Sequence, residues 1–180
     1  MKKDELQIIM RILSGKTEEF SYFMDVYGQQ VFTLVVRIVN SEEDAEEVTQ
    51  DVFMKAYMNL SSFNGISSFS TWLYRIAYNT AISYTRKRKN EEYVVDDKVW
   101  NTISDTEVDD ALSDESEAQI ELLMNALQKL PPEDRALITL YYEEEKSVKE
   151  ISSIFNLSES NVKVRLFRLR KKLYIEAKNI

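Results

Sequence analysis

Residues 147–173 read SVKEISSIFNLSESNVKVRLFRLRKKL and predict two helices joined by a short turn. Ser147 and Glu150 have the three-residue spacing of a capping box, which begins a helix. Asn156 lies in a turn, and Ser158 caps a second, longer helix. Four apolar residues stripe that second helix at helical spacing: Val162, Leu166, Leu169 and Leu173. A short helix, a turn and a longer basic helix predict a helix-turn-helix.

Composition narrows the fold and the chemistry of the whole chain. The 180 residues include only three glycines and two prolines, too few for the tight turns of hairpin-rich sheets, so an all-α chain is predicted. Because the sequence has no cysteine and no histidine, it excludes disulfides, thiolate and imidazole metal ligands, and histidine acid–base catalysis. No apolar stretch approaches the roughly 20 residues that cross a bilayer, and the amino terminus is unlike a signal peptide. A cytoplasmic protein without metal or cofactor is expected.

Two helical domains are predicted, one on each side of an acidic connector. The first domain spans residues 1–90, the second spans 117–180, and residues 91–116 are expected to be a flexible linker. The stretch 91–121 holds twelve acidic residues and one base, a net −11 in a chain whose total is −8. The remaining residues therefore sum to +3, and the acidic total does not exclude nucleic-acid binding.

Apolar periodicity places further helices within these two domains. The residues between Phe20 and Ile38 keep a helical period, and a second helix at 42–57 follows a Ser41 cap. Another begins near residue 116 and must end at Leu130, because two prolines follow.

The last predicted helix carries cations that suit a recognition helix in a DNA major groove. Residues near its amino end would reach base edges, with later cations on phosphates: Ser160, Asn161, Lys163 and Val164 come first. Arg165, Arg168 and Lys172 share one face, roughly away from the apolar stripe. The alternative is a solvated amphipathic helix whose late cations only complement the helix dipole.

The stretch FSTWLYRIAYNTAISYTRKRK (69–89) interleaves aromatic rings with cations and contains no acid. Rings can stack on exposed bases while cations follow the backbone, so this helix predicts a surface for single-stranded nucleic acid. The rings stand at Phe69, Trp72, Tyr74, Tyr78 and Tyr84. The preceding loop, 60–68, could hold a flipped base through backbone and hydroxyl groups. The alternative interpretation is that Phe69 and Trp72 are ordinary core residues.

The helix at 42–57 carries acidic residues on its outer side: Glu42, Glu43, Asp44, Glu46, Glu47 and Asp51. Acids early in a helix favour its dipole, which is one explanation. The other is an acidic docking face for a basic protein partner.

These segments together resemble the small two-domain bacterial sigma factors of the extracytoplasmic-function (ECF) group. The stretch DAEEVTQDVFMKAY (44–57) is similar to the family's core-polymerase-binding helix. Residues 69–89 are similar to its promoter-melting and minus-10-reading helix. Residues 130–173 are similar to its minus-35-reading helix-turn-helix. The combination in this order and spacing is specific, whereas the helix-turn-helix alone is not.

The resemblance implies a transcription-initiation subunit with no catalysis of its own. It implies that Glu47, Gln50 and Asp51 contact the clamp helices of the largest subunit of RNA polymerase core. The residues implied for minus-10 DNA are Phe63, Asn64, Ser67, Asn79, Ser83, Arg86, Lys87 and Arg88. The residues implied for minus-35 DNA are Ser160, Asn161, Lys163, Val164, Arg165, Arg168 and Lys172.

Two positions depart from the family pattern. Ser83 stands where an acid or amide is more usual, so the minus-10 preference stays open. Val164 stands where a small polar residue is common.

The resemblance further implies promoter DNA and an anti-sigma factor as partners. The anti-sigma factor is membrane-bound in many members and can hold the chain at the inner membrane. The resemblance implies no small-molecule substrate.

Two rival functions follow from the residues. A stand-alone transcriptional regulator would use the second domain on an operator and the first for dimerisation or ligand sensing, but it leaves residues 69–89 unexplained. An enzyme would need a carboxylate pair such as Asp96-Asp97 or Asp109-Asp110 to bind Mg²⁺. Adjacent acids in a flexible linker lack the preorganisation that catalysis requires.

Overall fold

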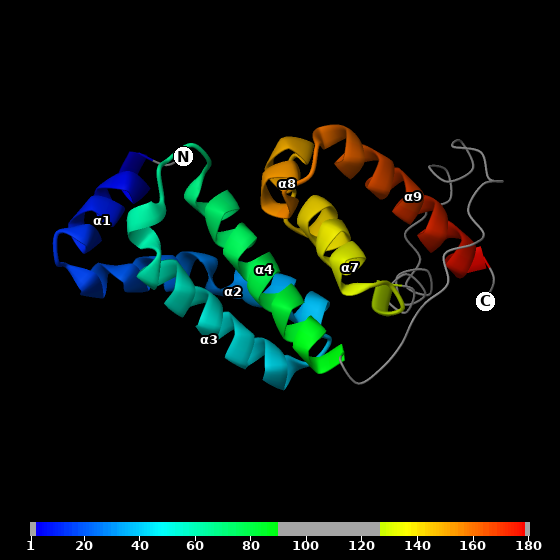
Figure 1. Cartoon of the computed structure of the whole chain (residues 1–180), viewed down its shortest axis with the longest axis horizontal. Coiled ribbons are helices and arrows are strands. Elements are labelled where there is room, and N and C mark those ends of the chain that lie inside the picture. Colours follow the sequence, from blue (N-terminus) through cyan, green and yellow to red (C-terminus); the bar gives the residue numbers. More distant parts are fainter. Residues whose placement is uncertain (1–2, 90–126, 179–180) are drawn as a thin grey trace.

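The computed structural model describes residues 3–89 and 127–178, which form helices and no strand (Figure 1). The all-α prediction is confirmed. The predicted linker (91–116) and the part of the predicted helix between 116 and 126 lie outside the described residues. We call residues 3–89 the first domain and residues 127–178 the second domain.

The first domain is a bundle of helices around an apolar core. Its elements are α1 (Lys3–Leu13), the 3₁₀ turn η1 (Thr17–Phe20), α2 (Ser21–Val39), α3 (Glu42–Met58), the 3₁₀ turn η2 (Leu60–Ser62) and α4 (Phe69–Lys89). Phe23 of α2 and Phe69 of α4 are fully buried, with ring centroids 4.0 Å apart. Phe69 is therefore a core residue, as the alternative interpretation of the sequence stated.

Local signals in the sequence set the helix boundaries of this domain. Asn40 takes a left-handed conformation (φ 61°) that ends α2, and an asparagine tolerates this better than most residues. Ser41 then accepts a hydrogen bond from the backbone N–H of Asp44 at 3.3 Å and begins α3. Ser68 does the same for α4, through the backbone N–H of Thr71 at 3.1 Å.

The second domain contains the predicted helix-turn-helix. Its elements are α7 (Pro132–Ile138), a π-helical turn η3 (Thr139–Glu143), α8 (Val148–Phe155) and α9 (Glu159–Lys178). Ser147 and Glu150 form both hydrogen bonds of the capping box, at 3.2 and 3.0 Å. Left-handed Asn156 (φ 55°) ends α8. The apolar stripe of α9, Val162, Leu166, Leu169 and Leu173, is buried.

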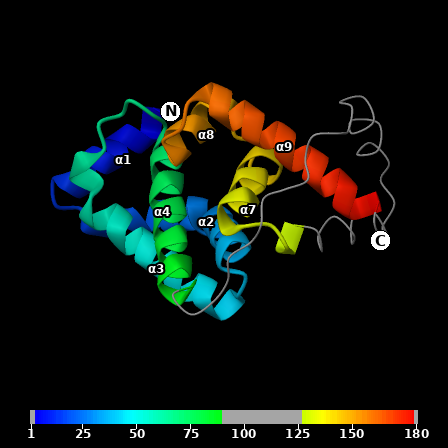
Figure 2. The same ribbon diagram turned by 45° about the vertical axis from the view of Figure 1, so that its right-hand side comes forward.

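The two domains pack against each other and share one hydrophobic core, which the sequence does not predict. Helix α8 lies on α4, and α7 lies on α2 (Figures 1 and 2). At the first contact, the rings of Tyr78 in α4 and Phe155 in α8 lie 4.2 Å apart.

Arg135 of α7 joins the second domain to the carboxyl end of α2. The last carbonyls of a helix have no partner within it, so they need donors from elsewhere. Arg135 donates to the carbonyls of Arg37 at 2.5 Å and Ile38 at 2.7 Å, and to its own domain's Leu130 carbonyl at 2.7 Å. Burial lowers the pKa of Arg135. The planar guanidinium thus bonds carbonyls of both domains at once.

We expect Arg135→Ala to lower the free energy of unfolding by about 2 kcal/mol, because charge-assisted hydrogen bonds are lost and helix carbonyls lose their donors. Urea unfolding followed by circular dichroism measures the change. Arg75→Ala is the matched control: Arg75 is an exposed arginine of α4, and its removal should change stability by less than about 0.5 kcal/mol. Equal losses in the two variants would contradict the role given to Arg135.

Candidate polymerase- and DNA-binding surfaces

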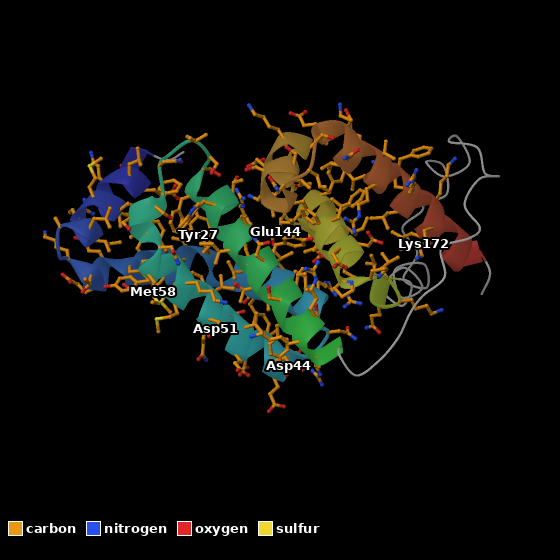
Figure 3. All side chains as sticks on the ribbon, viewed as in Figure 1. Tyr27, Asp44, Asp51, Met58, Glu144 and Lys172 are labelled. Carbon is orange, nitrogen blue, oxygen red and sulfur yellow. The ribbon has the colours of Figure 1, made fainter. Side chains whose placement is uncertain are left out.

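The outer face of α3 combines acids with exposed methionines. Glu47, Gln50 and Asp51 are all exposed, as the sequence predicts for a docking face. Helical spacing places Met54 (61% exposed) and Met58 (72% exposed) on the same face, and Figure 3 shows Asp51 and Met58 projecting from α3. Such a surface suits a partner that presents cations beside an apolar patch.

Asp44 differs from its predicted place on that outer face. Its carboxylate accepts a hydrogen bond from the Tyr84 hydroxyl at 2.7 Å and forms an ion pair with Arg88, so it joins α3 to α4. The hydrogen bond from Tyr84 lowers the pKa of Asp44, and the Arg88 charge adds to the effect. Arg88, predicted for minus-10 DNA, is therefore engaged within the protein.

Asn79 and Ser83 line an open groove of about 450 Å³ between α3 and α4. The other residues that matter to its chemistry are Lys55, Asn59, Trp72 and Arg75. The groove thus offers two cations, one indole ring and several hydrogen-bonding groups. That set can take phosphates, a stacked base and base edges of a single strand.

The loop before α4 adjoins this groove through Trp72. The ring of Phe63 lies 5.5 Å from that of Trp72, which itself lines the groove. Asn64 is exposed, and its side-chain oxygen accepts the backbone N–H of Ile66 at 3.1 Å, which shapes the turn. The Ser67 hydroxyl donates to the Ser68 carbonyl at 3.3 Å. Phe63, Asn64 and Ser67 therefore lie at the amino end of α4, about 15 Å of helix from Asn79.

Two of the aromatic residues predicted to stack on bases face the second domain instead. Tyr74 is only 2% exposed, and its hydroxyl donates to Glu144. Tyr78 packs on Phe155, and burial raises its pKa. These two rings are covered in this structure, so Trp72 is the ring of α4 that faces the groove.

The cationic end of α4 is partly engaged as well. Arg86 lies 3.7 Å from Glu133 of the second domain, although its side chain is largely exposed. Lys87 is exposed. Of the three cations predicted for minus-10 DNA at this end, the structure thus gives protein partners to Arg86 and Arg88.

The outer face of α9 carries most of the residues predicted for minus-35 DNA. Five of them are exposed: Ser160, Asn161, Lys163, Val164 and Arg168. Lys172 is half-buried. Arg165 differs from the prediction of an outward cation, because its guanidinium forms two short contacts with Asp134 of α7, at 2.8 and 2.7 Å. Arg165 therefore joins α9 to α7.

The sequence interpretation missed Phe167 and the glutamates at the domain contact. Phe167 is 40% exposed on α9, with the Lys171 ammonium 4.5 Å from its ring centroid. A helical projection places Phe167 about a third of a turn from the centre of the apolar stripe and about 60° from Val164, a signal present in the sequence. No local sequence pattern predicts that Glu143, Glu144 and Glu150 contact the first domain, because their partners lie far away along the chain.

Among the described residues, no group of three acidic, histidine or cysteine side chains could hold a metal ion. The carboxylate pairs considered for Mg²⁺ lie outside that part of the chain. Within the same residues, no helix combines the length and apolar character of a membrane span.

Family models match both domains. Residues 23–91 match Sigma-70 region 2, and residues 120–173 match Sigma-70, region 4. These two regions in one chain define a sigma-70-type sigma factor. The ECF RNA polymerase sigma factor SigW of Bacillus subtilis is 34% identical over 92% of each chain. The chain belongs to the ECF group of RNA polymerase sigma factors, as its resemblance predicted.

Two further proteins extend the comparison. The RNA polymerase sigma-H factor of Pseudomonas aeruginosa is 30% identical over 94% of this chain and 92% of its own. The solved sigma factor RpoE from Bartonella quintana, in complex with the anti-sigma factor NepR, has a TM-score of 0.67 at 21% identity. The alignment covers 89% of this chain and 98% of RpoE, and it shows the same fold.

We expect Asp44→Asn to destabilise the protein at pH 7 and to lose this effect in acid. The pKa of Asp44 is lower in the folded protein than its unfolded value of about 4, so its stabilisation is complete above that value. The stabilisation disappears as the pH falls through the folded pKa. Urea unfolding at pH 7 and pH 3 measures both effects. Asp51→Asn, on the exposed face of α3, is the control and should destabilise the protein less at pH 7; an equal loss at pH 7 in the two variants contradicts the role of Asp44.

Proposed function

We propose that this chain binds RNA polymerase core and directs it to promoters, with the first domain on the minus-10 element and the second on the minus-35 element. The observation that supports this most is the separation of three exposed surfaces: the outer face of α3, the groove along α4 and the outer face of α9. The three surfaces do not overlap, so each is assigned a partner of its own. The chain contributes binding and positioning, and the chemistry belongs to the polymerase.

For core polymerase, the partner of Glu47, Gln50 and Asp51 is a basic surface on the clamp helices of the largest subunit. Opposite charges steer the two proteins together and fix their register. The neighbouring Met54 and Met58 supply the apolar area that charged contacts alone lack.

For minus-10 DNA, the melted strand would follow the α4 groove. Asn79 and Ser83 would contact base edges, while Phe63, Asn64 and Ser67 would surround a flipped base at the amino end of α4. Lys87 would hold the backbone at the other end, joined by Arg86 and Arg88 if these exchange their protein partners for phosphates.

For minus-35 DNA, α9 would lie in the major groove. Ser160, Asn161, Lys163 and Val164 stand at its amino end, where recognition helices approach base edges. Arg168 and Lys172 would contact phosphates, and Arg165 would hold the helix in place through Asp134.

The place of action follows from these partners. Polymerase and promoter DNA put the chain in the bacterial cytoplasm. An anti-sigma factor is a further proposed partner, since RpoE was solved with one. A membrane-anchored anti-sigma factor would hold the chain at the inner membrane.

The test is a pull-down with core polymerase followed by run-off transcription on a pool of genomic templates. Binding to core and transcripts from a subset of templates are expected. No binding to core would overturn the proposal. A stand-alone regulator would instead leave footprints on duplex DNA without polymerase, in symmetric half-sites.

We expect the double variant Glu47→Lys, Asp51→Lys to lose affinity for core at least tenfold, because like charges then oppose the basic partner. Competition against the wild-type chain for limiting core measures the loss. Asp25→Lys, at an exposed acid of α2, is the matched control and should compete nearly as well as wild type. Equal competition by the double variant would remove α3 from the polymerase interface.

A further inference from the structure

The recognition face of α9 contains an apolar pair that folding does not require. Val164 is 48% exposed and Phe167 is 40% exposed, although the apolar stripe from Val162 to Leu173 already anchors the helix. A β-branched residue at an exposed helix position also lowers helix propensity slightly. Stability of the second domain therefore gives no reason for Val164.

Cations and small polar groups surround this pair. Lys163 and Arg168 are exposed beside it, and Ser160 stands one turn before Val164. The Lys171 ammonium lies 4.5 Å from the Phe167 ring centroid. An apolar strip within a cationic face fits a polyanion that also presents apolar groups.

The major groove of DNA is such a surface. Its edge carries one apolar group, the 5-methyl of thymine, among hydrogen-bonding atoms that are otherwise polar. Valine has no donor or acceptor, so a guanine, cytosine or adenine edge placed against it would lose water without a replacement partner. A thymine methyl has no such penalty.

Resting on the proposed minus-35 role of α9, we propose that Val164, supported by Phe167, reads the 5-methyl of a thymine in the minus-35 element. The pair thus selects an A·T base pair of fixed orientation at one position. Arg168 supplies affinity for the DNA phosphate backbone whatever the base sequence, whereas Val164 supplies the preference for thymine.

The test replaces each thymine of the minus-35 region, one at a time, with deoxyuracil, which removes the methyl and keeps base pairing. Binding of the reconstituted holoenzyme to these promoters is measured by competition. Burial of one methyl corresponds to a loss of about fourfold in affinity at one position. In a Val164→Ser holoenzyme, the thymine and uracil templates at that position should bind equally.

Two outcomes overturn this inference: a wild-type holoenzyme that is indifferent to uracil throughout the element, or a Val164→Ser holoenzyme that keeps the full discrimination. Arg168→Ala separates this from the proposed function itself. It should weaken binding to thymine and uracil templates alike. It should also reduce the slope of log affinity against log salt concentration by about one. If Arg168→Ala binds as wild type does, α9 is not the DNA-binding element.

Discussion

The guanidinium of Arg135 organises the contact between the two halves of this chain. A helix leaves its last carbonyls without partners within the helix, and at the end of α2 the Asn40 N–H bonds the carbonyl of Val36. Arg135 donates to two of them and to a carbonyl beside its own helix. A partly buried cation is tolerated best when its donors are used, so this geometry is constrained. It sets α7 on α2, and α8 then lies on α4.

Helix α4 consequently has three different faces. One side, with Leu73 and Ala77, packs on the core of the first domain. A second, with Tyr74 and Tyr78, meets the second domain. The third lines the groove and includes Asn79. Because a helix has 3.6 residues per turn, the residues of each face recur every three or four positions along the sequence. The aromatic residues are therefore divided between packing and binding.

This division explains how far the sequence could be interpreted. Caps and apolar stripes are local, so Ser147, Ser158 and the Val162–Leu173 stripe predicted their helices correctly. Partners far along the chain leave no local signal. Tyr74 and Glu144 are 70 residues apart, and nothing near either one reveals the other. Asp44 and Arg165 were predicted to face outward from their charge and their position on the helix, yet both are engaged by residues of neighbouring helices.

The acidic total charge of the chain does not describe the charge of its candidate binding faces. A net −8 would argue against DNA binding if the acids lay on the binding faces. Residues 91–121 contribute −11 of it, and Glu133, Glu144 and Glu150 are used against the first domain. The exposed outer face of α9 is left with Lys163 and Arg168 around Val164 and Phe167. On the proposed minus-35 role of α9, so few cations for phosphates make affinity for DNA depend on attachment to polymerase, and the uncharged side chains between those cations supply the selectivity.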